Sequence, residues 1–301
     1  MVYAGQMDCY GNCSEVLEKL SGVQVGATQI YRLTDLYGKG AEDEVNAERT
    51  LTPLKQDEVL YVEADGSMLL TREEGWKEVK VGRLFKSSDC IHAEAKPGWI
   101  SNSQYVALLG NSKEFTKIMD DLIESFGNLK NRLIFLSDGA TWIKNWIEDA
   151  FPQAISILDY YHACEHLHEF STSFFKDKKV EQKWTTRQKE LLLKSKVQKV
   201  IKNIEALALN NSTEAENLIA YYQANSSRMD YQKYKQLGCG IIGSGAIESA
   251  HRTVIQKRMK LSGQRWSRKG AQNMLNLRVI NKNHQWNKII EMSKYGLKAT
   301  G

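Results

Sequence analysis

The chain has 301 residues, 42 % of them hydrophobic and 26 % charged, which is usual for a globular protein with one large domain or two ordinary ones. No run of about 18 apolar residues occurs and the first residues do not resemble a signal peptide, so we expect no membrane span and a cytoplasmic location. The five cysteines are too few and too scattered for a disulfide framework.

Charge is divided unevenly along the chain. Residues 1–170 carry 16 Lys and Arg against 27 Asp and Glu, whereas residues 171–301 carry 25 against 9. Within residues 251–301 alone the count is 12 against 1. Such a split favours a basic half that meets a polyanion, with nucleic acid as the expected partner. A merely solvated basic face is the alternative.

The N-terminal part, residues 1–57, is predicted to be helical with a linker. Residues 13–38 show two short helical patterns with a break at Ser21-Gly22, which fits a helix-turn-helix, although any helical hairpin has this pattern. Residues 39–57 are rich in Glu, Asp and Lys and predict an acidic linker.

Residues 58–162 predict a mixed sheet flanked by helices. Apolar and alternating segments predict the order β-β-β-α-β-α-β, which is an antiparallel meander followed by parallel crossovers. The expected strands cover 59–64, 76–85, 104–109, 133–136 and 155–158, and the expected helices cover 112–126 and 140–150. The first strand is expected to end in a turn at Asp65-Gly66. Residues 163–237 show helical patterns only, and a helix is expected from Ala246 after the glycine-rich loop 238–245.

Three carboxylates stand at positions suited to metal binding. Asp65 and Asp138 each follow an apolar strand and precede a glycine, and Glu248 begins a helix after a Gly-Ser-Gly loop. Each has an ordinary explanation alone, as a turn residue, a helix cap or a first-turn acid. Together they form the ligand set of a two-metal phosphoryl-transfer site, because Mg²⁺ prefers oxygen ligands and close carboxylates repel without cations.

The surrounding motifs give a more specific indication. VEADGS around Asp65, FLSDGA around Asp138, IGSGAIES around Glu248 and the run RMKLSGQRWSRKGAQNMLNLR resemble bacterial insertion-sequence transposases of the Asp-Asp-Glu type, in particular the ISKra-type and Mutator-like groups. The resemblance covers about residues 5–280. It implies a ribonuclease-H-like catalytic domain with an all-helical insertion, residues 163–237, between the second Asp and the catalytic Glu. An Asp-x-x-His signature of that group reads Asp159 to His162 here and implies a supporting role for both residues.

The resemblance implies metal-dependent DNA cleavage and strand transfer at the ends of a mobile element. Asp65, Asp138 and Glu248 would hold two Mg²⁺ ions, with Mn²⁺ as a substitute, and the protein would act as a homo-oligomer on DNA. Two alternatives stay open: a nuclease of the same fold without joining activity, and a truncated remnant that only binds DNA. The second arises because full transposases of this group usually carry more sequence ahead of the helix-turn-helix.

The segment 238–301 carries Glu248 and a basic run, which we expect to contact DNA. Its arginines and lysines would hold phosphates, and its tryptophan would either stack on a base or anchor the last helix pair in the core. The run consists of Arg252, Lys257, Arg258, Lys260, Arg265, Trp266, Arg268 and Lys269.

Two further motifs give only weak indications of a zinc site and of a nucleotide-binding loop. The cluster His162, Cys164, Glu165, His166 and His168 suggests zinc, but it lacks the HExxH order and a second ligand group. The glycines between 238 and 245 lack the strand-loop-helix context of a nucleotide-binding loop. A flexible entry that lets Glu248 move into place explains them better.

Overall fold

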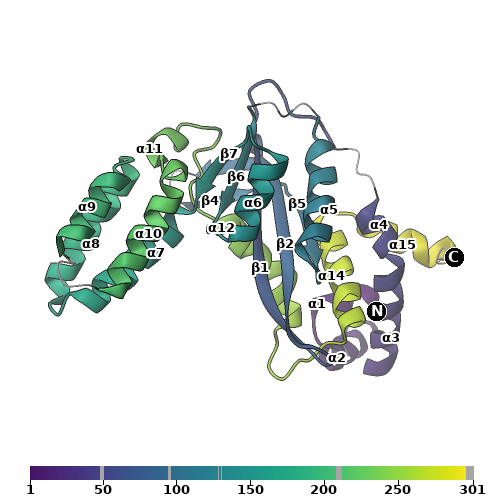
Figure 1. Ribbon diagram of the computed structural model, residues 1–301. Coiled ribbons are helices and arrows are strands. Elements are labelled where there is room, and N and C mark those ends of the chain that lie inside the picture. The colour runs from purple at the N-terminus through teal and green to yellow at the C-terminus, as the bar shows by residue number, and fades with distance from the viewer. Residues whose placement is uncertain (48–50, 94–95, 128, 130, 208–211, 296–301) are drawn as a thin grey trace.

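The computed structural model describes residues 1–47, 51–93, 96–127, 129, 131–207 and 212–295. Its centre is a mixed five-stranded sheet with the order β5-β2-β1-β6-β7 (Figure 1). β1, β2 and β5 pair antiparallel, whereas β6 and β7 run parallel to β1, which confirms the predicted mixed α/β sheet. The strands are β1 (Leu60–Thr71), β2 (Gly75–Lys86), β5 (Gln104–Leu108), β6 (Leu133–Ser137) and β7 (Ile155–Leu158).

β1 is longer than the sequence pattern predicts. It continues through Asp65-Gly66 and pairs with β2 over its whole length, so the predicted turn at this dipeptide is wrong. Gly66 is needed inside the strand because a Cβ there would overlap the side chain of Glu78. The glycine therefore makes room for the side chain of Glu78 on the neighbouring strand β2.

A small second sheet lies between β2 and β5 in the sequence and was not predicted. It consists of β3 (Cys90–Ala93) and β4 (Lys96–Ile100), which pair antiparallel with an irregularity near Ile91. The 3₁₀ turn η1 (Ser87–Asp89) connects it to the end of β2.

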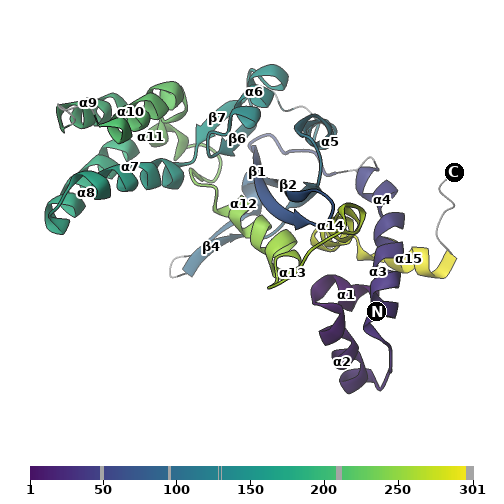
Figure 2. The same cartoon turned by 60° about the horizontal axis from the view of Figure 1, so that its bottom comes forward.

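Helices α5 (Ser112–Glu124) and α6 (Thr141–Ala150) cover one face of the large sheet (Figure 2). The side chain of Asn111 caps α5 by accepting a hydrogen bond from the N–H of Glu114. Phe115 and Met119 of α5 and Trp146 of α6 then pack against Val62 and other apolar side chains of this face.

The opposite face of β1, β2 and β5 is covered by the C-terminal part of the chain. Helix α12 (Gly245–Ala250) continues into a π-helical turn, η3 (His251–Gln256), and the short α13 (Lys257–Met259). The long helix α14 (Arg268–Lys282) packs beside β5, and α15 (Trp286–Tyr295) follows it.

The N-terminal helices are α1 (Val2–Met7), α2 (Tyr10–Ser21), α3 (Ala27–Gly40) and α4 (Glu42–Asn46). Of these, α3 and α4 pack on α14, whereas α1 and α2 pack mainly on α3. The predicted break at Ser21-Gly22 is confirmed, because Gly22 ends α2 with a φ of 68°. The predicted linker 39–57 is only partly a linker: α3 runs to Gly40, α4 follows, and residues 48–50 lie outside the described residues.

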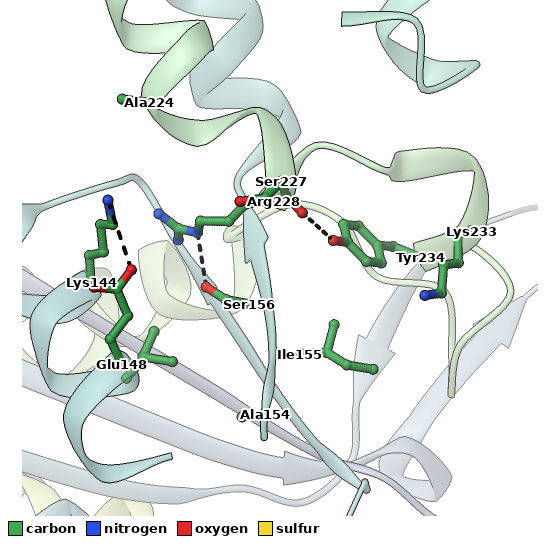
Figure 3. Close-up of a pocket in the computed structure, with 11 residues that line it drawn as sticks. Lys144, Glu148, Ala154, Ile155, Ser156, Ala224, Ser227, Arg228, Lys233 and Tyr234 are labelled. Atoms are coloured by element: carbon green, nitrogen blue, oxygen red, sulfur yellow. Dashed lines mark hydrogen bonds and ion pairs between the residues drawn. The ribbon is translucent and has the colours of Figure 1, made fainter. Parts of the chain in front are cut away.

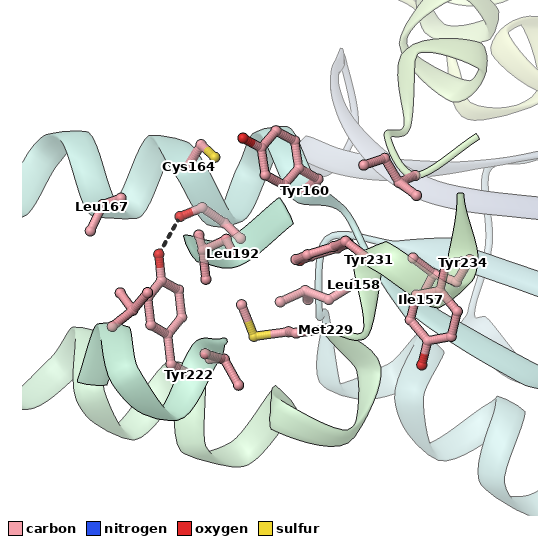
Figure 4. Packing of buried hydrophobic residues seen from close by; sticks show 14 of the residues in the cluster. Ile157, Leu158, Tyr160, Cys164, Leu167, Leu192, Tyr222, Met229, Tyr231 and Tyr234 are labelled. Atoms are coloured by element: carbon pink, nitrogen blue, oxygen red, sulfur yellow. Dashed lines mark hydrogen bonds between the residues drawn. The ribbon is translucent and has the colours of Figure 1, made fainter. Parts of the chain in front are cut away.

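Residues 160–234 form a helical lobe at one end of the sheet (Figure 1). The helical pattern predicted here is confirmed. Its elements are α7 (Tyr160–Phe174), α8 (Lys178–Leu193), α9 (Val197–Leu207), α10 (Thr213–Asn225), η2 (Ser226–Arg228) and α11 (Tyr231–Tyr234). Ile157 and Leu158 of β7 enter the same apolar cluster as Tyr222 and Tyr231, so the lobe shares a core with the sheet (Figure 4). In the described part of the chain, no helix has the length and apolar character to cross a membrane.

Candidate catalytic site

Three aspartates lie just beyond the parallel strand pairs. The last paired residues of β1 and β6 are Glu63 and Leu136, and Asp65 and Asp138 each lie two residues further along the chain. The last paired residues of β6 and β7 are Ser137 and Leu158, and Asp138 and Asp159 each follow them directly. Neighbouring strands are about 4.8 Å apart. We call the part of the sheet where these three residues lie the aspartate edge.

Helix α12 is attached to the same face of the sheet by two buried hydrogen bonds. The N–H of Ile247 donates to Glu63 Oε2 over 2.6 Å, and the guanidinium of Arg83 donates to the carbonyl of Ala246 over 2.8 Å. Glu63 and Arg83 face each other across β1 and β2. Glu248, the next residue of α12, is thereby held beside the sheet with an exposed side chain.

Glu63 is fully buried and was not singled out from the sequence. Burial raises the pKa of Glu63 to about 8, and the negative charges of Asp159 and Glu248 add to this effect. The hydrogen bond from Ile247 and the charge of Arg83 oppose it. The carboxylates of Asp159 and Glu248 thus lie within electrostatic range of Glu63, two residues before Asp65. Alternation along β1 would have indicated that Glu63 and Asp65 share a face.

His251 is a second residue that sequence reasoning did not select. It follows Glu248 by three residues, so the two stand about one helical turn apart. Its side chain is buried, and Nε2 lies 3.0 Å from Asp65 Oδ2. Among the described residues neither ring nitrogen has a hydrogen-bond partner. The π-helical turn that begins at His251 brings this imidazole to the aspartate edge, and such turns are frequent at functional sites.

The carboxylates of Asp138 and Asp159 accept hydrogen bonds from nearby groups of the protein. Asp138 accepts a hydrogen bond from the N–H of Ala140, and Asp159 accepts from Tyr161 N–H and from the hydroxyl of Ser244. In the described ranges, no three or more His, Cys, Asp or Glu side chains are grouped closely enough to hold a metal ion.

Two buried side chains near the start of α12, Glu63 and His251, have polar atoms without a hydrogen-bond partner in the described part of the chain. Glu63 Oε1 and His251 Nε2 both lack a hydrogen-bond partner among the residues described. Buried polar groups normally have one. Carboxylate oxygens suit Mg²⁺ and Mn²⁺, and an imidazole nitrogen adds preference for a transition metal. The two residue types are chemically suited to a divalent ion, although the described side chains are not grouped closely enough to form a complete ligand set.

The two supporting residues from the Asp-x-x-His signature lie in different surroundings. Asp159 is buried and ties α7 to the loop before α12 through Ser244. His162 is turned instead toward Glu165, 3.3 Å away, and His166, with ring centroids 4.7 Å apart. Within the described ranges, His162 makes no direct contact with the three aspartates.

His166 continues this line of contacts toward the aspartate edge. Its ring centroid lies 4.6 Å from that of Tyr221, and the Tyr221 hydroxyl donates to the carbonyl of Asp138 over 3.0 Å. His162 is thus connected to Asp138 only through two intervening side chains. The alternative zinc cluster is not supported, because Cys164 is buried in the apolar core of the lobe.

The glycine-rich loop is closely packed at several of its glycines, and its flexibility stays a prediction. A Cβ at Gly238 would overlap Val59 and Tyr61, and one at Gly243 would overlap Tyr161. Gly238 also has a φ of 52°, which favours glycine. These glycines let the loop lie against the end of the sheet and the start of α7.

The basic run divides into exposed and buried members. Six side chains are exposed: Arg252, Lys257, Lys260, Arg265, Arg268 and Lys269. Arg258 is 1 % exposed and lies between Tyr10 and Trp266, with its guanidinium carbon 4.8 and 5.1 Å from the ring centroids. Trp266 is also buried and donates from Nε1 to the carbonyl of Met259. The prediction that Arg258 and Trp266 contact DNA is therefore corrected, since both anchor the core.

Arg228 joins the helical lobe to the aspartate edge and gave no sequence signal among the many basic residues around it. It donates to Ser137 Oγ over 2.7 Å and to Ser156 Oγ over 2.9 Å, so it connects β6 and β7 just before Asp138 and Asp159. Figure 3 shows Arg228 in a pocket of about 340 Å³ between α6, the start of β7 and α11, with Lys144 across from it. Burial lowers the pKa of Arg228.

A family model described as an uncharacterised protein family, UPF0236, matches residues 4–295. The chain belongs to this family. The UPF0236 match runs from α1 to the last residue of α15 and so includes both the sheet and the helical lobe. A UPF0236 protein from Streptococcus gallolyticus, named after the vanSb 3′ region, is 24 % identical over 238 residues, which cover 76 % of this chain and 51 % of that protein. The chain spans about half the length of this curated relative.

Proposed function

We propose that this UPF0236 protein is a metal-dependent DNA strand-transferase of the Asp-Asp-Glu type, with Asp65, Asp138 and Glu248 as the metal-binding carboxylates. One relationship supports the proposal: Asp65 and Asp138 each follow the paired residues Glu63 and Leu136 by two positions, and the hydrogen bond from Ile247 to Glu63 holds the start of α12, with Glu248, beside β1. These three carboxylates come from distant parts of the sequence, and this arrangement is what a shared ion site requires.

The architecture supports the same proposal at the level of the fold. An antiparallel β1-β2-β5 meander followed by parallel β6 and β7 matches the order expected for a ribonuclease-H-like domain. The helical lobe lies between Asp138 and Glu248 in the sequence, as the resemblance to insertion-sequence transposases implies. A fold alone does not define a function, so the carboxylates carry more weight.

The chain's own residues would divide the work as follows. Asp65, Asp138 and Glu248 would hold two divalent ions. Glu63 and Arg83 attach α12 to the sheet through hydrogen bonds. When bound, such ions supply activation of an attacking oxygen and stabilisation of the leaving oxygen. The exposed basic side chains after Glu248 would hold DNA phosphates and orient the strand. We propose element ends and target DNA as substrates, bound by a homo-oligomer.

The test is nicking and joining of a labelled DNA substrate in Mg²⁺ or Mn²⁺, with EDTA as the metal-free control. Asp65→Asn, Asp138→Asn and Glu248→Gln should each lower the nicking rate by at least about 10³-fold, because all three serve the same ions. Asp149→Asn, an exposed acid on α6, is the matched control and should leave the rate unchanged. DNA affinity should change little in all four variants.

Three outcomes would contradict the proposal in different ways. Nicking without joining would support a ribonuclease-H-like nuclease. DNA binding without nicking in either metal would support a non-catalytic binding protein. Equal nicking by the three variants and the unmodified protein would show that the site lies elsewhere.

A further inference from the structure

Two cysteines that are distant in the sequence meet beside the loop that leads to α12. The Sγ atoms of Cys90 and Cys239 lie 2.7 Å apart, although 149 positions separate the residues. Cys90 begins β3, and Cys239 lies in the packed glycine-rich loop, where its N–H donates to the Tyr61 hydroxyl over 3.2 Å. Both thiols are free and partly exposed. A disulfide bond measures about 2.05 Å, so only a small movement of either side chain is needed to form one.

We propose that Cys90 and Cys239 are a reversible oxidation site, at which a small-molecule disulfide such as oxidised glutathione converts the two thiols into an intramolecular disulfide. The bond would tie the loop ahead of α12 to the end of β2 and the start of β3. This inference does not depend on the proposed DNA chemistry.

The two thiols are unequal in a way that suits this exchange. The hydrogen bond between them is the main cause that lowers the pKa of Cys239, and it raises the pKa of Cys90. A hydrogen bond with Tyr61 also lowers the pKa of Cys239. Both effects favour the thiolate of Cys239, which is the nucleophilic form.

The reaction proceeds by two exchanges and needs no other oxidant. The Cys239 thiolate attacks one sulfur of the small disulfide, forms a mixed disulfide and releases one thiolate. Cys90 then loses its proton and attacks Cys239 Sγ, which breaks the mixed disulfide and releases the second thiolate. The two protons from the protein thiols end on the two released small thiols. Two protein thiols are thus oxidised while one small disulfide is reduced.

The other cysteines lack such a partner. Cys13 Sγ donates to the carbonyl of Ala4, and Cys164 is buried in the core of the helical lobe. Cys9 is partly exposed at the start of α2, where its carbonyl accepts a hydrogen bond from the N–H of Cys13, and it serves as a control position. Oxidation should therefore be confined to one pair.

The new bond would close a loop of about 150 residues that contains Asp138, Asp159 and the whole helical lobe. Cross-links that close long loops remove much conformational freedom from the unfolded chain. We therefore expect oxidation to raise Tm by about 5 °C or more and reduction to reverse the change.

The experiment treats the reduced full-length protein with oxidised glutathione and maps the products by mass spectrometry without reductant. We expect loss of two hydrogen atoms, a single linked peptide that joins Cys90 and Cys239, and a Tm increase that dithiothreitol reverses. Cys90→Ser should instead keep glutathione on Cys239, and Cys239→Ser should form no link. Cys9→Ser should behave like the unmodified protein.

Several results would overturn the proposal. A persistent glutathione adduct on the unmodified protein would show that Cys90 does not attack. Linkage through another cysteine pair, or no reaction of Cys239, would show that the site is wrong. A Cys90–Cys239 link without a change in Tm would show that the bond does not restrain the chain.

Discussion

His251 Nε2 and Asp65 Oδ2 lie 3.0 Å apart where the π-helical turn after α12 meets the middle of β1. The imidazole is buried, whereas the Asp65 carboxylate is 38 % exposed, so the contact lies at the inner side of the candidate site. His251 therefore packs against the inner side of Asp65 and leaves the outer side of this carboxylate accessible. Because Glu248 belongs to the preceding helical turn, a single segment controls two of the groups at this edge.

Substitution of His251 should weaken metal binding without unfolding the protein. His251→Gln keeps a polar side chain of similar length but loses the imidazole that contacts Asp65. We expect the affinity for Mn²⁺ to fall about 10- to 100-fold, as is usual when a group that orients a ligand is lost. Isothermal titration with Mn²⁺ measures the affinity, and thermal unfolding in EDTA checks the fold.

His92→Gln is the matched control for this experiment, since His92 is exposed on β3. It should leave Mn²⁺ affinity unchanged. If His251→Gln binds Mn²⁺ as tightly as the unmodified protein, His251 has only a packing role.

Glu63 should determine how firmly α12 is held. Glu63→Gln retains an oxygen that accepts the hydrogen bond from Ile247, so its free energy of unfolding should stay within about 1 kcal/mol of the unmodified value. Glu63→Leu leaves the Ile247 N–H without an acceptor and Arg83 without its neighbouring carboxylate. We expect a loss of about 2–4 kcal/mol. Urea unfolding measured in EDTA tests the difference, and equal stability of the two variants would contradict the role given to this hydrogen bond.

The sheet was the most predictable part of the fold because its strands carry strong local patterns. Leu133 to Leu136 are all buried and read as a continuous apolar run, and Val79 to Phe85 of β2 are all buried as well. The end of β1 was mispredicted because Asp-Gly is a frequent turn pair, whereas here pairing with β2 outweighs that local preference. Tertiary contacts, which a single sequence does not display, decided the outcome.

The candidate site, like the fold, was only partly predictable from the sequence. Asp65, Asp138 and Glu248 could be selected because each lies in a recognisable local motif. Glu63 and His251 could not, because their importance comes from burial and from contacts with residues more than 180 positions away. For Arg258, the sequence shows a basic residue within a basic run, but only the fold reveals that Tyr10 and Trp266 enclose it.

Arg258 and Arg265 form a matched pair that separates core packing from DNA binding. Arg258 is buried and donates from Nε to the carbonyl of Gly5, whereas the side chain of Arg265, on the same basic run, is exposed. Arg258→Gln should lower the free energy of unfolding by about 2–4 kcal/mol, because it removes both ring contacts and a buried hydrogen bond. Arg265→Gln should change it by less than about 0.5 kcal/mol.

The same two variants should affect DNA binding in the opposite order. An exposed arginine that contacts a phosphate releases about one counterion, so Arg265→Gln should reduce the slope of log affinity against log salt by about 0.9. Arg258→Gln, measured at a temperature where it remains folded, should keep the slope of the unmodified protein. Fluorescence anisotropy with a labelled duplex at several NaCl concentrations gives both slopes. If Arg258→Gln flattens the slope and leaves stability unchanged, Arg258 contacts DNA and does not anchor the core. A slope near zero for the unmodified protein would remove nucleic acid from the proposed function.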